Sequence, residues 1–276
     1  MDILHEEYGW ELPRYIIDNL KHIPRSYQSE AIRYFHYTQT SETFKHRKPN
    51  QLMFNMATGA GKTDLMAGLI LYLFKEKGYQ NFLFTVNTNG VLSKTIDNLT
   101  NDQSTKFLFN SHLEIEGEHI SINHISGKFP DLPDKNDVNI KFVSIQTLTN
   151  ELFTQAENVM SLKDYQRAKM VILADEAHHY SASTKKKSKK ELEKASWEKS
   201  LLSLLHTHTE NLLLEFTATL DFDDETIYEK YRDKIIYRYA LDSYIKDGFS
   251  KNVRRIQTGN SKPEIWLIEI CSPSIS

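Results

Sequence analysis

Residues 51–75, QLMFNMATGAGKTDLMAGLILYLFK, constrain the fold of this chain more than any other stretch. A strand-length apolar run at 51–57 is followed by a glycine-containing loop and then by an apolar pattern with helical spacing. A strand, a tight loop and a helix in this order favour an α/β fold, with the loop at the carboxyl end of its strand. The buried face of the predicted helix carries Leu65, Leu69, Ile70, Leu73 and Phe74.

The loop has the composition of a phosphate-binding turn. Gly59 and Gly61 accept a positive φ and leave no Cβ in the way of a ligand, so backbone N–H groups can turn inward at the positive end of the helix. Lys62 is predicted to reach the β- and γ-phosphates, and the Thr63 hydroxyl to face Mg²⁺. Met56 stands where the full phosphate-loop pattern has a glycine, so a glycine-rich turn before a core helix stays the alternative. The predicted nucleotide-binding residues of the loop are Ala57, Thr58, Gly59, Ala60, Gly61, Lys62 and Thr63.

Four further strand-like runs alternate with helical stretches. They lie at 81–87, 140–148, 170–176 and 211–220. Strands that alternate with helices predict a mainly parallel sheet covered on both faces, with ligands at the carboxyl ends of the strands. The polar residues 100–139 are expected to form an insertion or hairpin over the sheet edge.

Composition limits the classes of function. The net charge is −3, from 34 basic and 37 acidic residues, so no global positive field indicates nucleic acid, although a binding face can be locally basic. Cys271 is the single cysteine, which excludes an intramolecular disulfide and a cysteine-based zinc site. No apolar run is long enough to span a bilayer, and the acidic start is unlike a secretory signal. We therefore expect a soluble, cytoplasmic protein with no membrane partner.

Two adjacent carboxylates, Asp175 and Glu176, follow the apolar run VILA. Hydrolysis of a magnesium nucleotide requires one carboxylate to hold the metal and one to orient and deprotonate the attacking water. Asp175 and Thr63 are the predicted metal ligands, and Glu176 is the predicted base. An exposed turn after the strand is the alternative. His178 and His179 also leave a different metal site open, although the pattern H-E-x-x-H is absent.

Three motifs in chain order resemble motifs I, II and III of superfamily 2 helicases and translocases. They are ATGAGKT, DEAH at 175–178 and FTATL at 216–220, and the flanking ILADEAHHYSA and VSIQTL are similar to Res subunits of type III restriction enzymes. This resemblance implies a RecA-like three-layer α/β/α domain with a mainly parallel sheet, a P-loop NTPase. It also implies ATP and Mg²⁺ as cofactors, helicase-type ATP hydrolysis, and nucleic acid, expected to be double-stranded DNA, as partner. The implied catalytic residues are Lys62, Asp175, Glu176 and His178.

The resemblance assigns a coupling role to the third motif. In the family, Thr217 and Thr219 would hydrogen-bond toward the DEAH end, with His178 as the relay between γ-phosphate and nucleic acid. The same hydroxyls could instead satisfy an exposed strand terminus.

A segment ahead of motif I, IPRSYQSEAIRYF at 23–35, resembles the element in which a glutamine reads adenine. Gln28 is the matching position, and Arg25 and Tyr27 are its expected neighbours. A glutamine amide can pair with the N6/N7 edge of adenine. A helix start without a ligand is the alternative.

Segments 85–99 and 144–150 lie where motifs Ia and Ib touch the nucleic-acid backbone in the family. The candidate contacts are Thr88, Asn89, Thr147 and Leu148, with ordinary capping and turns as the alternative. The lysine-rich run that begins at 183 is interpreted as a solvated loop, with a nucleic-acid contact as the alternative.

The resemblance covers about residues 20–255, which is one RecA-like domain. We expect an N-terminal extension at 1–22, an ATP-binding domain at 23–250, and an exit segment with a tail at 251–276. A superfamily 2 motor has a second such domain that supplies arginine fingers; Arg254 and Arg255 are interpreted as surface residues. The expectation is a truncated or split motor without the second domain and nuclease, weakly active alone, whose partner is a second motor domain or a modification (methyltransferase) subunit.

Two rival functions remain open at this stage. The first is a catalytically silent nucleotide-binding module that acts through a partner. The second is a small-molecule kinase, against which the adjacent carboxylates and FTATL argue.

Overall fold

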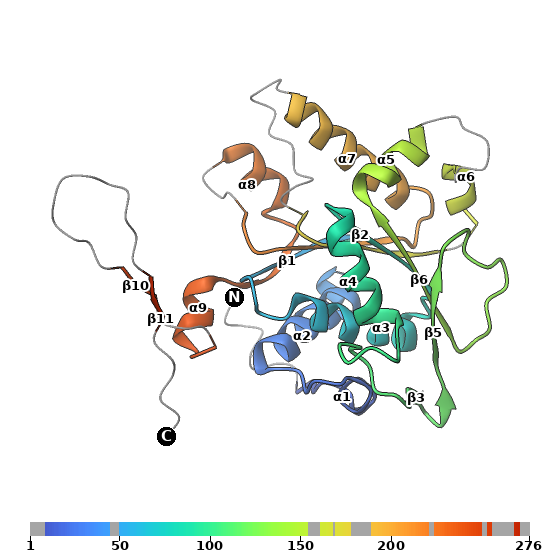
Figure 1. Cartoon of the computed structure of the whole chain (residues 1–276), viewed down its shortest axis with the longest axis horizontal. Coiled ribbons are helices and arrows are strands. Elements are labelled where there is room, and N and C mark those ends of the chain that lie inside the picture. Colours follow the sequence, from blue (N-terminus) through green and yellow to red (C-terminus); the bar gives the residue numbers. More distant parts are fainter. Residues whose placement is uncertain are drawn as a thin grey trace.

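A seven-stranded parallel sheet forms the centre of the chain in a computed structural model that describes residues 9–44, 50–153, 161–167, 169–177, 189–220, 224–249, 253–255 and 268–270. Within these residues the strand order is β5-β6-β2-β7-β8-β1-β9 (Figure 1). The strands of the sheet are β1 (Gln51–Met56), β2 (Asn81–Val86), β5 (Ser121–Ile125), β6 (Asp137–Ser144), β7 (Val171–Ala174), β8 (Leu212–Thr217) and β9 (Ile235–Tyr239).

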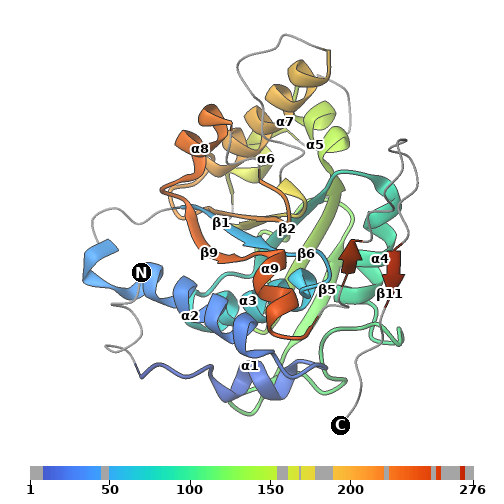
Figure 2. The same ribbon diagram turned by 90° about the vertical axis from the view of Figure 1, so that its left-hand side faces the viewer.

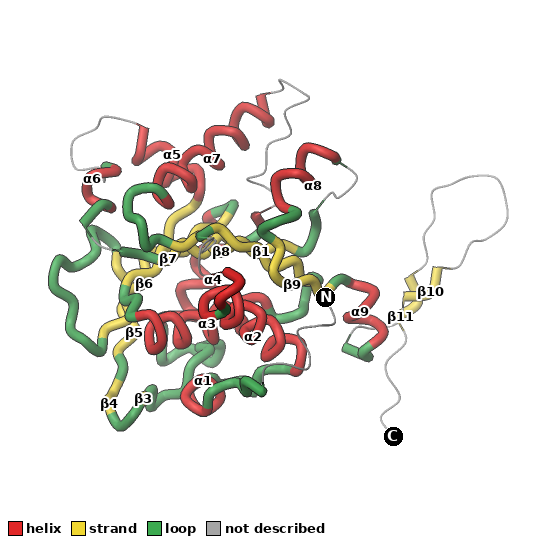
Figure 3. Tube along the Cα trace, turned by 180° about the vertical axis from the view of Figure 1, so that it is seen from behind, coloured by secondary structure: helices red, strands yellow, loops and turns green. Residues whose placement is uncertain are grey.

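Helices cover both faces of this sheet (Figures 1 and 3). One face carries α1 (Arg14–Asn19), α2 (Ser26–Thr40), α3 (Lys62–Lys77) and α4 (Asn89–Thr100). The other face carries α5 (Ile145–Phe153), α6 (Leu162–Tyr165), α7 (Lys189–Leu205) and α8 (Glu225–Tyr231). The predicted three-layer α/β/α architecture, with a parallel sheet, is therefore confirmed.

Successive side chains of each strand point to opposite faces of the sheet, so the domain has two hydrophobic cores. The first core contains Phe54 and Phe216, whose rings stack with centroids 4.9 Å apart, beneath α2, α3 and α4. The second core contains Met53 and Leu213 beneath α5, α6, α7 and α8. Because both faces are buried, the central strands read as continuous apolar runs, which is why the sequence marks them clearly.

The helix α3 begins at Lys62 and ends at Lys77, with left-handed Gly61 before it and left-handed Gly78 after it. A left-handed glycine is a common helix C-cap because it carries no Cβ penalty. The apolar stripe predicted from the sequence is buried against the sheet, and only Phe74 is partly exposed. The strand, loop and helix predicted at 51–75 are confirmed.

Three details of the fold differ from the prediction. The run at 140–148 is not one strand, because β6 ends at Ser144 and α5 begins at Ile145. Residues 100–139 contain the expected hairpin, β3 (Glu114–Ile115) and β4 (Glu118–His119), but they also supply the edge strand β5. At the other edge, β9 pairs in parallel with β1, so the sheet has a strand after the last strand-like run, 211–220, that the sequence indicated.

Beyond β9, the short helix α9 (Leu241–Lys246) lies past the edge of the sheet, and its Tyr244 contacts Tyr27 of α2 (Figure 2). Two further strands, β10 (Val253–Arg255) and β11 (Ile268–Ile270), pair with each other and lie apart from the main sheet (Figure 1). No helix among the described residues is both long enough and apolar enough to cross a membrane.

Candidate functional site

The parallel sheet brings the three sequence motifs to one edge. β7, β8 and β1 are neighbours in the sheet and run in the same direction, so their carboxyl ends lie side by side. These ends lead into the phosphate loop at 57–61, into Asp175 and into the turn after Thr217. Segments far apart in the sequence therefore meet where ligands of open α/β sheets bind.

The loop has the backbone of a phosphate cradle. Gly59 and Gly61 have φ values of +82° and +72°, in the left-handed region. A Cβ on Gly61 would lie 2.6 Å from Nε2 of Gln28, so Gly61 is required by its neighbour as well as by its own backbone. The Ala60 N–H donates to the Ala57 carbonyl at 3.1 Å and closes the turn between the two.

Gln28 braces the loop from α2. Its Nε2 donates to the carbonyls of Ala60 (3.3 Å) and Gly61 (3.0 Å), and its Oε1 accepts the Arg25 N–H (2.8 Å). The side chain is buried, and both amide hydrogens are used. The predicted adenine contact is not tested here; the second lone pair of Oε1 is the part of the amide left for it.

The amide groups that follow the loop are available to an anion. In the described part of the chain, no group accepts the N–H of Gly61, Lys62 or Thr63. The first N–H groups of a helix have no intrahelical partner, and with the helix dipole they form an anion site. The loop residues therefore fit a phosphate group.

The carboxylates of motif II face Lys62. The Asp175 N–H donates to the Thr85 carbonyl at 3.0 Å, which extends the pairing of β7 by one residue. Glu176 then takes a φ of +52°, unusual for a residue with a side chain, and its Oε1 lies 3.6 Å from Nζ of Lys62. Only 9% of the Lys62 side chain is exposed, against 38% for Glu176. Motif I and motif II therefore lie side by side in the fold.

Burial, and to a lesser extent the nearby Glu176, raise the pKa of Asp175 to about 6, although Lys62 acts in the opposite direction. A buried carboxylate beside a second one favours a cation in its neighbourhood. Its oxygen atoms, with the Thr63 hydroxyl, are the hard ligands that Mg²⁺ prefers. Among the described residues, no group of three or more His, Cys, Asp or Glu side chains is arranged so that it could hold a metal ion.

Replacing Asp175 with asparagine is expected to stabilise the nucleotide-free protein at pH 7 to 8. A carboxyl whose pKa is raised in the folded state destabilises that state above about pH 6, and the penalty disappears below about pH 4, where the unfolded chain is protonated too. The gain in unfolding free energy is about 2 to 3 kcal/mol at most. Thermal unfolding of the variant between pH 4 and pH 8 measures it, with exposed Asp131→Asn as the control. A pH-independent difference would contradict this interpretation.

The third motif forms a local turn. The Thr217 hydroxyl is buried, donates to the Thr219 carbonyl (3.0 Å) and accepts the Thr219 N–H (3.3 Å). Asn55, which the motifs did not single out, ties the ends of β1 and β8 together by donating to the Thr217 carbonyl at 3.3 Å. His178, the predicted relay, lies outside the described residues, as does His179, so the coupling role stays a prediction.

Asp64 is a further residue that sequence reasoning missed. It lies in the first turn of α3, next to Thr63, and its Oδ1 is 2.7 Å from Nδ1 of His22. A carboxylate in the first turn of a helix is stabilised by the helix dipole. An acidic residue directly after the phosphate loop was the signal in the sequence.

The predicted nucleic-acid contacts lie at the same edge of the sheet, after β2 and β6, on the side of β7 away from β1. Thr88 is exposed before α4, and Asn89 is the first residue of that helix. Thr147 is exposed in α5, and its hydroxyl lies 2.8 Å from that of Ser144. Leu148, in contrast, is fully buried in the second core, so a contact through its side chain is excluded. Most of the lysine run and the side chains of Arg254 and Arg255 lie outside the described residues.

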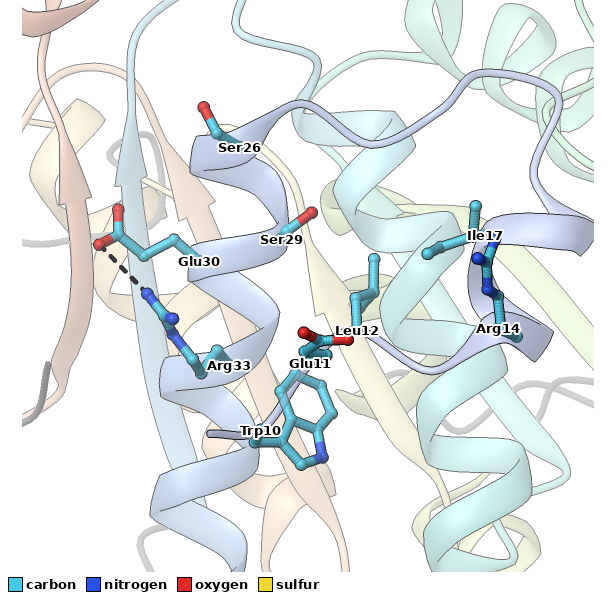
Figure 4. A pocket seen from close by; sticks show the side chains of 9 residues that line it. All are labelled: Trp10, Glu11, Leu12, Arg14, Ile17, Ser26, Ser29, Glu30 and Arg33. Atoms are coloured by element: carbon cyan, nitrogen blue, oxygen red, sulfur yellow. Dashed lines mark ion pairs between the residues drawn. The ribbon is translucent and has the colours of Figure 1, made fainter. Parts of the chain in front are cut away.

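A separate pocket, of about 540 Å³, lies between α2 and the N-terminal segment (Figure 4). On α2 it is lined by Ser26, Ser29, Glu30 and Arg33. No predicted site residue lines it. The pocket is therefore distinct from the phosphate loop.

Comparison with known proteins identifies relatives of this chain. The family model described as type III restriction enzyme, res subunit, matches residues 21–222. The chain is 38% identical, over 277 aligned residues, to a probable type III restriction-modification enzyme Res subunit, HindVIP, of Haemophilus influenzae. That alignment covers 92% of this chain and 53% of the relative.

Two more distant similarities were found. The endonuclease subunit of the type I restriction enzyme EcoKI of Escherichia coli is 23% identical over 227 residues, which cover 82% of this chain and 17% of that one. The solved structure of a nuclease-deletion mutant of the Type ISP restriction-modification enzyme LlaGI, with a DNA substrate mimic, has a TM-score of 0.49 at 17% identity. It covers 81% of this chain and 20% of that chain.

Proposed function

Because the chain belongs to the Res-subunit family of type III restriction enzymes, we propose that it is an ATP-binding motor domain of a DNA-directed superfamily 2 helicase or translocase. The observation that carries this proposal is the contact between Lys62 of the phosphate loop and Glu176 of motif II, 3.6 Å apart beyond the carboxyl ends of β1 and β7. Each partner has a defined role in nucleotide hydrolysis, and the fold brings them together from distant parts of the chain.

Each residue has its own task in this proposal. The amides from Gly61 to Thr63 and the Lys62 ammonium hold the β- and γ-phosphates of the substrate ATP. Asp175 and Thr63 would hold Mg²⁺, which supplies positive charge to the phosphate oxygens. Glu176 orients the attacking water and accepts its proton. Gln28, with Arg25, is proposed to contact adenine. His178 is proposed to relay the state of the γ-phosphate to Thr217 and Thr219.

The proposed division of the chain keeps an extension at 1–22, an ATP-binding domain at 23–250 and a following segment at 251–276. The chain spans about half the length of its Haemophilus influenzae relative.

The proposed partners are double-stranded DNA and either a second motor domain or a modification subunit. The proposed contacts to DNA are the exposed Thr88 and Thr147 with the first turn of α4 at Asn89, since hydroxyls and helix N-termini suit phosphate oxygens.

This chain by itself is proposed to turn ATP over slowly. The transferred phosphoryl group develops negative charge, and an arginine finger that meets it contributes about 10³ to 10⁵ in rate. A second domain or partner would supply this cation.

The test of the proposed function is phosphate release by the purified chain, with and without double-stranded DNA, across a salt series. We expect slow release that DNA accelerates, and a DNA affinity that falls steeply with salt because counterions are released from the backbone. Release that DNA leaves unchanged at low salt, with turnover of a small hydroxyl-bearing acceptor instead, would favour the small-molecule kinase. ATP binding with no release under any condition would favour the catalytically silent module.

A further inference from the structure

Tyr244 of α9 contacts the phosphate loop although no motif includes it. Its hydroxyl donates to the carbonyl of Gly59 at 2.9 Å, and the ring is buried. The two residues are 185 positions apart in the sequence. The phosphate loop is therefore held from two sides, by Gln28 from α2 and by Tyr244 from α9.

An aromatic cluster fixes the Tyr244 ring. Tyr27 of α2 meets it edge to face at 6.3 Å between centroids, and Tyr239 of β9 stacks on Tyr27 at 4.2 Å. Phe249 stacks on the outer side of Tyr244 at 6.0 Å, and the Arg25 guanidinium lies 4.8 Å from the Phe249 ring centroid. These contacts place the hydroxyl in one direction and so lower the entropy cost of its hydrogen bond.

The end of α9 explains why Phe249 lies there. The Gly248 N–H bonds to the Ile245 carbonyl (3.0 Å) and the Phe249 N–H to the Tyr244 carbonyl (3.2 Å), while Gly248 has a φ of +77°. This pair of bonds is a Schellman motif, in which the residue after the left-handed glycine turns back over the last helical turn. The segment that follows α9 is thus hydrogen-bonded to Tyr244, the residue that contacts the phosphate loop.

The peptide unit between Gly59 and Ala60 is held at both ends. In a trans peptide the carbonyl and the next N–H point in opposite directions. Here the carbonyl accepts the Tyr244 hydroxyl, and the Ala60 N–H donates to Ala57. Loss of the first bond leaves this unit held only through its N–H, beside Gly59, whose left-handed φ of +82° marks a position where a residue without a Cβ can change its backbone angles easily.

We propose that Tyr244 is a positioning residue of the phosphate loop, which links α9 to the occupancy of the ATP site. This inference rests on the proposed ATP-binding function. Because linkage is reciprocal, phosphate that favours the held conformation of the loop also favours the docked position of α9, by the same factor. The docked position of α9, which follows β9, therefore depends on whether nucleotide is bound, and the Tyr244 hydroxyl carries this coupling.

Tyr244→Phe tests the proposal, because it removes the hydroxyl and keeps the ring. Loss of one neutral hydrogen bond is expected to raise the dissociation constant for ATP by about threefold to tenfold. Hydrogen–deuterium exchange without nucleotide should become faster in a peptide covering 57–62. ATP should slow exchange at 241–249 in the wild type and do so less in the variant.

Tyr237→Phe is the matched control. Tyr237 lies on β9 and its hydroxyl donates to Glu30 at 2.8 Å, so one buried tyrosine hydroxyl bond is lost without a contact to the loop or to α9. The control should change ATP affinity less than twofold and leave exchange at 57–62 unchanged. The positioning role is overturned if Tyr244→Phe binds ATP like the wild type, or if its loop exchanges at the wild-type rate. A wild-type chain that binds no ATP would refute the proposed function instead, while the nucleotide-free exchange still decides the role of Tyr244.

Discussion

Replacing Lys62 with alanine is expected to weaken ATP binding by at least about 100-fold, because a hydrogen bond to a charged group contributes about 1.5 to 3 kcal/mol and the ammonium is predicted to make two. The side chain is only 9% exposed and already faces the carboxylate of Glu176, so it is held at the site before ATP arrives. An isothermal calorimetric titration of wild type and variant measures the loss.

Lys75→Ala is the control for this change. Lys75 lies in the last turn of the same helix and pairs with Glu116, so the variant loses the same charge and a lysine ion pair at the opposite end of α3. Its ATP affinity should match that of the wild type. Equal affinities for Lys62→Ala and the wild type would exclude the phosphate loop as the binding site.

Replacing Glu176 with glutamine is expected to leave ATP binding largely intact and to lower the rate of hydrolysis by about 10² to 10⁴, the usual contribution of a positioned general base. Glutamine keeps the size of the side chain and can still hold a water, but it accepts no proton. The strained φ of +52° shows that the backbone is held in an unfavourable region while the carboxylate faces Lys62. Single-turnover release of phosphate from labelled ATP measures the rate.

Glu116→Gln is a closely matched control for the base. Glu116 is the other non-glycine residue with a positive φ among the described residues, at +54°, and it also pairs with a lysine. The control variant therefore repeats the change of charge and backbone context away from the site. If both variants hydrolyse ATP at the wild-type rate, Glu176 is not the base.

The central part of the fold was predictable because local and global signals agree there. β1, β2, β7 and β8 are buried on both faces, so their apolar runs are continuous, and the loop between β1 and α3 carries glycines where the backbone needs a positive φ. The adjacent Asp175 and Glu176 marked a strand end directly. These features depend on residues close together in the sequence.

The parts that were missed depend on contacts between distant segments. The edge strands β5 and β9 are only partly buried and carry mixed polar and apolar residues, so their pattern is weak. The apolar run at 140–148 crosses from β6 into α5, because Ile145 and Leu148 are buried in the second core while Ser144 bonds to Thr147 at the helix start.

The role of individual polar side chains was the least predictable part of the site. The amide of Gln28 was predicted to contact adenine, which stays a prediction, but its hydrogen bonds to the carbonyls of the phosphate loop were not predicted. The role of Tyr244 could not be predicted from the sequence, because its partner Gly59 lies 185 positions away. Such contacts follow from the packing of α2 and α9 beside β9, which no local pattern encodes.

The most direct test of the central claim is calorimetric titration of the wild-type chain with ATP, ADP and AMP in the presence of Mg²⁺. A phosphate loop holds the β-phosphate through its amides and lysine, so ATP and ADP should bind at least about tenfold more tightly than AMP, the difference that one charge-assisted contact provides. Equal binding of all three nucleotides, or no binding of ATP, would contradict the assignment of residues 57–63 as the nucleotide site.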